Sequence, residues 1–287
     1  MWAAQDWKEY RVLDTSGGEK LERWGDYVLL RPDPQVIWDT PKTHPMWKHI
    51  NAHYHRSKSG GGEWEFFDLP DEWGISYKNL SFRLKPFSFK HTGLFPEQAV
   101  NWDWMSQKIR NAGRPIKAIN LFAYTGGATL AMLEAGASVT HVDASKGMVT
   151  WAKENAAASH LADRPVRWIV DDCKKFVERE LRRGNHYDAV VMDPPSYGRG
   201  PKGEIWKMEN SIYEFLILCE KLLSDKPLFF VLNSYTTGLA PATLKYMLST
   251  VLKKRGGKAE ADEVGLPVEQ NGLILPCGSC GRWLADD

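Results

Sequence analysis

The residues Asp193-Pro194-Pro195-Ser196-Tyr197 place a carboxylate, two prolines and an aromatic ring directly after a short apolar run. Two consecutive prolines end a strand and hold their carbonyl groups in fixed directions. An exocyclic amine bound there could donate one hydrogen to the Asp193 carboxylate and another to the Pro194 carbonyl. Tyr197 could stack on the base that carries the amine. These groups would aim the nitrogen lone pair at an electrophilic carbon, whereas the alternative is a proline-rich turn with a capping aspartate.

A second stretch with chemical potential runs from Lys117 to Asp143, with the sequence KAINLFAYTGGATLAMLEAGASVTHVD. The apolar run 118–122 predicts a buried strand, and Tyr124-Thr125-Gly126-Gly127 predicts a sharp turn that glycine makes accessible. A helix follows and ends at Gly136, and 138–142 predicts a second strand. A carboxylate at the tip of that strand can accept hydrogen bonds from two ribose hydroxyls, so the stretch indicates a nucleoside site.

Two classes of nucleoside ligand fit this pattern. A dinucleotide-binding dehydrogenase also has glycines after its first strand and an acidic residue about 20 positions later. However, the spaced pattern G-x-G-x-x-G is absent, and the turn offers paired glycines instead. Because S-adenosylmethionine (SAM) carries no phosphate, it needs a close backbone wall and polar groups for its amino-acid end rather than a phosphate cradle. The stretch therefore favours SAM.

The elements that must position these residues alternate between strands and helices. Ser145 is a good N-cap for a helix to about Ala158, and 166–170 predicts a third strand that ends in Asp171-Asp172-Cys173. One of these two aspartates could bind the adenine amine while the other caps the next helix. Further expected helices lie at 97–111, 174–183, 211–223 and 240–253, and further strands at 187–192, 228–232, 259–264 and 272–276.

The first third of the chain has a different composition. Nine of the thirteen tryptophans fall at or before Trp104, and short aromatic runs are separated by Pro, Gly, Asp and Asn. Strands are expected at 27–31, 35–38, 64–67, 75–77 and 80–84, the last two joined by a Lys78-Asn79 turn. We therefore expect a small, mostly β domain at 1–95 and a catalytic domain at 96–287. The tryptophans would chiefly fill a thin core, or alternatively stack on unpaired bases.

Two groups of residues could bind metal ions. His49 and His53 could chelate a metal on one helical face, but no Glu completes an H-E-x-x-H pattern. The histidine-rich segment 44–62 fits a mobile arm that touches phosphates, or a solvated loop. Cys277-x-x-Cys280 has no second pair, which disfavours zinc and redox roles. We expect no metal site.

Composition limits the possible classes of protein. The chain has 287 residues, 43% hydrophobic and 25% charged, with a formal net charge of +1. No overall charge attracts it to nucleic acid or to an anionic membrane, so RNA contacts must come from local patches. Four cysteines, no export signal and no run of about 18 apolar residues indicate a cytoplasmic protein without a membrane span.

The order of the motifs resembles the class I SAM-dependent methyltransferases. More narrowly, it is similar to the group that contains bacterial 23S ribosomal RNA methyltransferases acting on cytosine carbon-5 or on guanine nitrogens. The residues that carry the resemblance are HTGLFPEQ at 91–98, NLFAYTGGAT at 120–129, VDASKGMVTWAKENA at 142–156, DDCKKF at 171–176 and DPPSYGRGPKGEIWK at 193–207.

This resemblance implies an α/β fold with a Rossmann-like, seven-stranded sheet of order 3-2-1-4-5-7-6. It also implies a SAM site in which Phe95 and Gln98 close over the cofactor. The implied cofactor-binding residues are Phe95, Gln98, Phe122, Ala123, Tyr124, Thr125, Gly126, Gly127, Asp143, Ala144, Ser145, Asp171, Asp172, Cys173 and Asp193.

The chain departs from the group at one position. Members that act on cytosine carbon-5 carry a nucleophilic cysteine after the fifth strand, where this chain has Asn233-Ser234-Tyr235-Thr236. We therefore expect methylation of a nucleobase nitrogen in structured RNA, with ribosomal RNA as the expected substrate. Arg199, Lys202 and Lys207 are candidate RNA contacts. The alternatives are methylation of a protein amide or a small amine, and a non-catalytic RNA-binding protein that keeps the fold.

Overall fold

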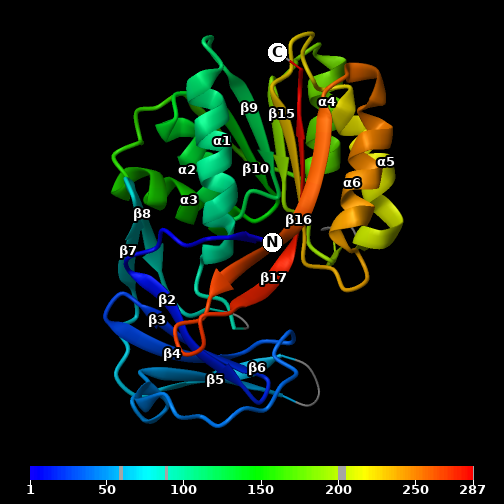
Figure 1. The fold of residues 1–287 in the computed structure, drawn as a ribbon. Helices are drawn as coiled ribbons and strands as arrows, with labels where there is room; N and C mark the ends of the chain where they lie inside the picture. Colours follow the sequence, from blue (N-terminus) through cyan, green and yellow to red (C-terminus); the bar gives the residue numbers. More distant parts are fainter. Residues whose placement is uncertain (58–60, 88–89, 200–204, 287) are drawn as a thin grey trace. The chain divides into compact units, whose positions relative to one another are not determined.

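The structure is a computed structural model that describes residues 1–57, 61–87, 90–199 and 205–286. The chain divides into two compact units, shown in Figure 1. The first contains Met1–Val100 and Gly265–Cys277, and the second contains Asn101–Val264 and Gly278–Asp287. Among the described residues, no helix is long and apolar enough to cross a membrane.

The second unit is built on a parallel sheet with an antiparallel end. Its parallel strands lie in the order β11 (Val166–Val170), β10 (Ser138–Asp143), β9 (Lys117–Leu121), β12 (Ala189–Met192) and β15 (Phe229–Ser234). Then come β17 (Ile274–Leu284), antiparallel to β15, and β16 (Lys258–Pro267). When only these seven strands are numbered, in chain order from β9, the order is 3-2-1-4-5-7-6.

Among the described residues this sheet has eight strands, whereas the family resemblance implied seven. The additional strand is β1 (Trp2–Ala3), next to β16. The following residue, Ala4, donates its backbone N–H to the Gly265 carbonyl at 3.0 Å, at the end of β16 that belongs to the first unit. A strand of two residues carries too little periodicity to be recognised from sequence.

Within the described residues, the helices α1 to α6 cover the two faces of the sheet in the second unit (Figure 1). On one side lie α1 (Ala99–Asn111), α2 (Gly127–Glu134) and α3 (Lys146–Ala158), and on the other lie α4 (Cys173–Arg182), α5 (Met208–Glu220) and α6 (Pro241–Val251). Every residue of β12 and β15 is buried. A parallel sheet covered on both faces requires buried apolar runs such as 189–192 and 229–232, which is why the sequence revealed these strands.

The first unit is mostly β. Its main sheet has the order β2 (Tyr10–Ser16), β3 (Glu19–Trp24), β4 (Tyr27–Pro32), β5 (Ala52–Arg56) and β6 (Gly62–Phe66). Only the β4–β5 pair in it is parallel among the described residues. The hairpin of β7 (Trp73–Tyr77) and β8 (Leu80–Leu84) turns at Lys78, which has φ +52°, so the predicted turn is confirmed. Short 3₁₀ turns lie at Pro45–Lys48 and Pro96–Gln98 in this unit. A third, Lys253–Arg255, lies in the second unit.

The tryptophans of the first unit pack rather than project. Trp24 is fully buried and meets Tyr10 edge-on, with ring centroids 4.6 Å apart. Trp7 is buried and donates its Nε1–H to the Pro96 carbonyl at 2.9 Å. In the described part of residues 1–95, none of the seven tryptophans is exposed. These positions support the core-filling interpretation over base stacking.

Several sequence predictions need correction. Residues 35–38 form no strand, while β2, β3 and β5 were missed. Charged residues interrupt the apolar pattern of β3, because Glu22 is buried there as part of an ion-paired group. The hairpin of β13 (Tyr197–Arg199) and β14 (Ile205–Lys207) was not predicted. Residues 265–277 belong to the first unit, although the sequence placed them in the catalytic domain.

Candidate active site

The carboxyl ends of four parallel strands meet at one edge of the second unit's sheet. Leu121 at the end of β9 pairs with Val142 of β10 on one side and with Met192 of β12 on the other. Asp143 pairs in turn with Val170 of β11. The segments that follow these strands therefore share one edge, where open α/β sheets bind ligands. These segments are 122–127, 143–145, 171–173 and 193–197.

The turn after β9 holds its backbone in an unusual conformation. Phe122 and Tyr124 have φ values of +55° and +51°, and Gly126 has +91°. Each non-glycine residue in this left-handed region costs about 1–3 kcal/mol unless its surroundings fix it. The surroundings do so here: the Phe122 N–H donates to Cys173 Sγ at 3.2 Å and the Tyr124 N–H to Asp143 Oδ2 at 2.9 Å. The strain is stored at the ligand edge.

Gly126 and Gly127 are each required for a different structural reason. A Cβ on Gly127 would lie 2.6 Å from the Trp102 ring of α1, a distance that real Cβ atoms do not reach. A Cβ on Gly126 would lie 3.0 Å from Ala152 Cβ, at a φ that disfavours side chains. The sequence predicted the turn correctly. It did not show that helix packing, through α1 and α3, requires the two glycines.

Asp143 organises the loops on both sides of it. Its Oδ2 accepts the Tyr124 N–H, and its Oδ1 accepts the Ser145 N–H at 2.8 Å. Burial raises the pKa of Asp143 above its usual value, although the two backbone N–H groups act in the opposite direction. A carboxylate has about four acceptor positions, so each oxygen keeps one for a hydroxyl donor. Ser145 also caps α3 through the Met148 N–H, as predicted, and Ala144 beside it is exposed.

The acidic pair after β11 is already engaged with the protein. Asp172 caps α4 by accepting the Lys175 N–H at 2.9 Å, so the predicted helix cap is Asp172. Asp171 forms an ion pair with Arg179. Cys173 is buried, and burial raises the pKa of its thiol well above the usual value. The thiol accepts the Phe122 N–H and is thus a structural support of the turn.

The Asp193-Pro194 turn follows β12 next to the glycine turn. The Asp193 N–H donates to the Leu121 carbonyl at 3.3 Å, which fixes the start of the turn beside the end of β9. Pro194 is buried, and within the described part of the chain no donor is recorded for its carbonyl. Tyr197 is 49% exposed at the start of β13, opposite Lys207 in the pairing register.

Trp206 connects the two turns, although no sequence pattern singles it out. Its Nε1–H donates to the Pro195 carbonyl at 2.7 Å. Its ring packs against Phe122, with centroids 5.4 Å apart, and both rings meet Phe215 of α5. The residue lies in a short hairpin whose antiparallel pairing brings it back to the proline turn. Only that pairing reveals the contact.

The structure describes the remaining predicted residues only in part. Phe95 and Gln98 belong to the first unit, where the Gln98 N–H donates to the Phe95 carbonyl at 3.1 Å and Gln98 is buried. Their predicted closure over a cofactor stays a prediction. Lys207 is exposed at the end of β14. Lys202 and the side chain of Arg199 lie outside the described residues.

Comparison with known proteins identifies the family. The sequence model of the S-adenosylmethionine-dependent methyltransferases matches residues 16–224. A crystal structure of a SAM-dependent methyltransferase from Agrobacterium tumefaciens is 35% identical, with a TM-score of 0.92, and the match covers 98% of this chain and 92% of that chain.

Two relatives carry the name ribosomal RNA large subunit methyltransferase K/L. The protein from Pseudoalteromonas atlantica is 36% identical over 220 residues, which are 67% of this chain and 29% of the relative. The protein from Shewanella sp. is 33% identical over 146 residues, which are 50% of this chain and 20% of the relative. The chain thus spans less than a third of the length of these relatives. By the family match and the full-length structural likeness, it belongs to the S-adenosylmethionine-dependent methyltransferases.

Proposed function

We propose that this methyltransferase acts on a nitrogen of a nucleobase in structured RNA, with ribosomal RNA as the substrate class. The observation that carries the proposal is the Asp193-Pro194 pair, a carboxylate and a proline carbonyl that follow β12 beside the glycine turn. An amine that donates to both groups has its lone pair directed away from them. Correct alignment of amine and methyl carbon contributes up to about 7–11 kcal/mol in the best intramolecular systems.

The residues at the sheet edge fit SAM by their chemistry. SAM presents a ribose diol, an adenine amine and an ammonium group, all donors, and this edge carries acceptors on Asp143, Asp171 and Asp193. When bound, SAM supplies an electrophilic methyl group on its sulfonium. We assign Asp143 to the ribose and the turn 122–127 to the methionine end. The full proposed set is Phe95, Gln98, Phe122, Ala123, Tyr124, Thr125, Gly126, Gly127, Asp143, Ala144, Ser145, Asp171, Asp172, Cys173 and Asp193.

Tyr197 is the proposed platform for the target base. Its ring is half exposed, and Tyr197 lies in the β13–β14 hairpin, one paired position from Trp206, which donates to the Pro195 carbonyl. Aromatic rings that are exposed beside a catalytic turn stack on unpaired bases in RNA enzymes. The names of the relatives support ribosomal RNA as the substrate, and such a reaction would take place in the cytoplasm.

The test is transfer of labelled methyl groups from SAM to total RNA from a strain that lacks this gene, followed by nucleoside analysis. We expect label in guanine or adenine. Asp193→Ala should lose turnover to a much greater extent than it loses SAM affinity, whereas Asp225→Ala, at an exposed position, should match the wild type in both. Full turnover by Asp193→Ala contradicts the mechanism. Label that resists ribonuclease and is released by protease contradicts the substrate assignment and indicates a protein amide.

A further inference from the structure

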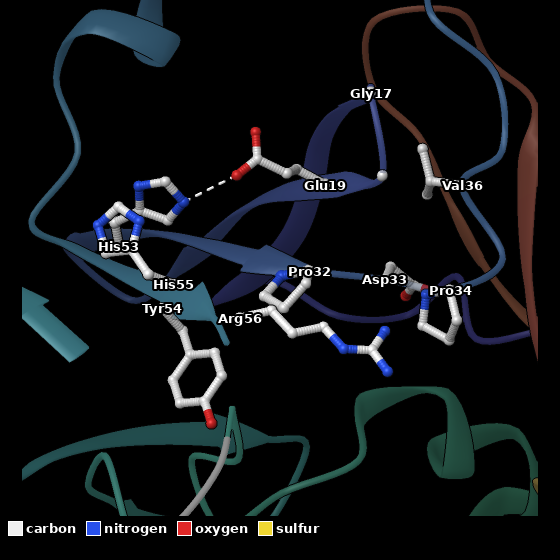
Figure 2. A pocket seen from close by; sticks show the side chains of 11 residues that line it. Gly17, Glu19, Pro32, Asp33, Pro34, Val36, His53, Tyr54, His55 and Arg56 are labelled. Carbon is white, nitrogen blue, oxygen red and sulfur yellow. Dashed lines mark hydrogen bonds and ion pairs between the residues drawn. The ribbon is translucent and has the colours of Figure 1, made fainter. Parts of the chain in front are cut away.

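Two histidines of the first unit lie side by side in a pocket that the methyltransferase chemistry does not use. The pocket has a volume of about 480 Å³, and its lining includes Glu19, Asp33, His53, His55 and Arg56. Figure 2 shows the two imidazole rings together on one side of it, with His53 joined to Glu19 and the Arg56 guanidinium extending away from the rings. The ring centroids of His53 and His55 are 3.9 Å apart.

Strand geometry brings the histidines and a carboxylate together. Residues two apart on a strand point to the same face, so His53 and His55 share a face of β5. Glu65 of β6 pairs directly with His53 in the antiparallel register. One ligand atom from each of His53, His55 and Glu65 lies within 4.8 Å of the others. Two imidazoles and a carboxylate form a common donor set for zinc.

A fourth residue orients the set. Glu19 Oε1 lies 2.7 Å from His53 Nε2, and Glu65 Oε2 lies 2.8 Å from His55 Nε2. Glu19 is also held by Lys42, whose ammonium donates to Oε2 at 2.8 Å. Histidines that bind metals usually donate their other ring N–H to a carboxylate, which fixes the ring. Glu19 is placed for that role toward His53.

We propose that His53, His55 and Glu65 bind one divalent transition-metal ion, with zinc as the best match, and that Glu19 positions His53. Ligand atoms in a tetrahedral zinc site are about 3.3 Å apart, given bond lengths of about 2.0–2.1 Å. His55 and Glu65 are exposed, with side-chain exposures of 47% and 53%, so rotation of their side chains can close the difference. A water molecule would complete the coordination.

The charges and donor atoms of this cluster argue against phosphate, calcium and magnesium as its ligand. A phosphate would face the carboxylates of Glu19 and Glu65 next to the rings, and these repel an anion. Calcium and magnesium prefer sites made of oxygen atoms, whereas two imidazoles select zinc and its neighbours. The expectation of no metal site was based on His49 and His53, taken as neighbours on one helical face. His49 instead follows a 3₁₀ turn, and His53 lies in β5.

The ion would stabilise the edge of the first unit's sheet. Glu65 lies on the outermost strand, β6, and β5 pairs with β4 at only two described positions, Leu29 with Ala52 and Leu30 with His53. A metal bound to β5 and β6, with Glu19 of β3 attached to His53, links three strands. This proposal does not depend on the RNA substrate or on SAM.

The test is zinc binding to the full-length, tag-free protein after removal of metal with a chelator, measured by titration calorimetry and by the visible absorption of the cobalt-substituted protein. We expect one equivalent of zinc, a spectrum typical of tetrahedral cobalt, and a zinc-dependent increase in Tm. The double variant His53→Asn/His55→Asn should bind more than about tenfold more weakly. His49→Asn, at an exposed histidine outside the set, should match the wild type.

Glu65→Gln gives an independent variant, since this exposed side chain can change without disturbing the fold. It should also weaken zinc binding and remove the increase in Tm. Circular dichroism establishes that each variant is folded. Equal affinity in the wild type and in a folded His53→Asn/His55→Asn or Glu65→Gln variant overturns the proposal, as does a wild type that shows no saturable zinc binding.

Discussion

Asn233 at the end of β15 lies directly opposite Cys280 of β17 in the antiparallel register. Cys280 is fully buried, and burial raises the pKa of its thiol to about 12. The thiol donates to Asn101 Oδ1 at 3.4 Å, and Asn101 in turn donates its amide N–H to Asn233 Oδ1 at 3.1 Å. The thiol of Cys280, the cysteine paired with Asn233, is therefore a protonated structural group.

The first prediction concerns this thiol. Cys280→Ser should retain methyl transfer, because no covalent adduct with the base is required for attack by a nitrogen. We expect a kcat close to that of the wild type and a modest loss of stability, since the smaller hydroxyl packs less well in a buried site. Loss of turnover in a folded Cys280→Ser protein that still binds SAM would contradict nitrogen chemistry. The comparison variant is Cys219→Ser, at a buried cysteine within α5.

The second prediction tests the link between Trp206 and the proline turn. Trp206→Phe keeps an aromatic ring against Phe122 but removes the hydrogen bond to the Pro195 carbonyl. A hydrogen bond of this kind contributes about 0.5–1.5 kcal/mol, so kcat/KM should fall roughly two- to twelvefold. The Kd for SAM should stay unchanged. Trp168→Phe, on β11, serves as the control, and an equal loss in both variants would point to general destabilisation.

The elements of the second unit could be predicted because each carries its own local pattern. β12 and the first four residues of β15 are continuously apolar, Ser145 caps α3, and the glycine turn interrupts a hydrophobic run. The left-handed φ values of Phe122 and Tyr124 could not be predicted. They depend on Cys173 and Asp143, which are distant in sequence and meet the turn only in the folded sheet.

The histidine cluster could not be predicted for the same reason, because its members meet only after two strands pair. In the sequence, His49 and His53 have helical spacing, and the strand spacing of His53 and His55 has no meaning until β6 pairs with β5. Trp206 is a comparable case, because its contact with Pro195 depends on the β13–β14 pairing. Spacing along the chain predicts which residues share a face of one element. It does not predict which elements will face each other.

The third prediction separates two glycines that lie in helices of the second unit. Gly127→Ala places a Cβ 2.6 Å from the Trp102 ring, and overpacking of this kind costs about 1–3 kcal/mol. A Cβ on Gly147 of α3 meets only Ser145 Oγ at 3.7 Å, so Gly147→Ala should be neutral or stabilise by up to about 1 kcal/mol. Thermal unfolding measures both effects. If Gly127→Ala were as stable as Gly147→Ala, the packing explanation would be wrong.

The fourth prediction concerns the pH dependence of SAM binding through Asp143. Burial raises the pKa of this carboxyl above the usual Asp value of about 3.9, so it takes up a proton at a higher pH than an exposed aspartate does. The ionised form is the better acceptor for the ribose. SAM affinity should therefore fall as the pH is lowered through the raised pKa, while the folded state itself gains stability relative to the unfolded state in that window.

Asp143→Asn tests this dependence. The amide cannot accept through both of its polar atoms, so one of the N–H groups of Tyr124 and Ser145 loses its acceptor. SAM affinity should drop by about 1.5–3 kcal/mol, roughly 10- to 150-fold, and the decrease at acid pH should disappear. Titration calorimetry at a series of pH values measures both effects. If SAM affinity still fell at acid pH in Asp143→Asn, the pH dependence would belong to another group. The control is Asp225→Asn, which should behave as the wild type does.

The fifth prediction concerns a buried ion pair in the first unit. Arg31 donates to Glu22 through Nε at 2.7 Å and through Nη2 at 2.9 Å, and Glu22 is fully buried. Burial alone would raise the pKa of Glu22, but the charges of Arg31 and Lys20 outweigh it and lower the pKa to about 2. Since the unfolded value is about 4.3, the stabilisation is complete above that pH and is lost as the pH falls toward 2.

Glu22→Gln should destabilise the protein by about 3–5 kcal/mol at neutral pH, because it leaves Arg31 buried without its charge partner. Urea unfolding followed by tryptophan fluorescence detects this change through Trp24, whose ring lies 5.1 Å from the Arg31 guanidinium carbon. The difference between wild type and variant should shrink as the pH falls from about 4 toward 2, because in this range the unfolded wild-type chain takes up a proton on Glu22 while the folded protein keeps the carboxylate ionised. Glu214→Gln, at an exposed position of α5, should show no such difference at any pH. A Glu22→Gln deficit that stays constant between neutral pH and about pH 2 would mean that shape and hydrogen bonding, rather than charge, hold this core together.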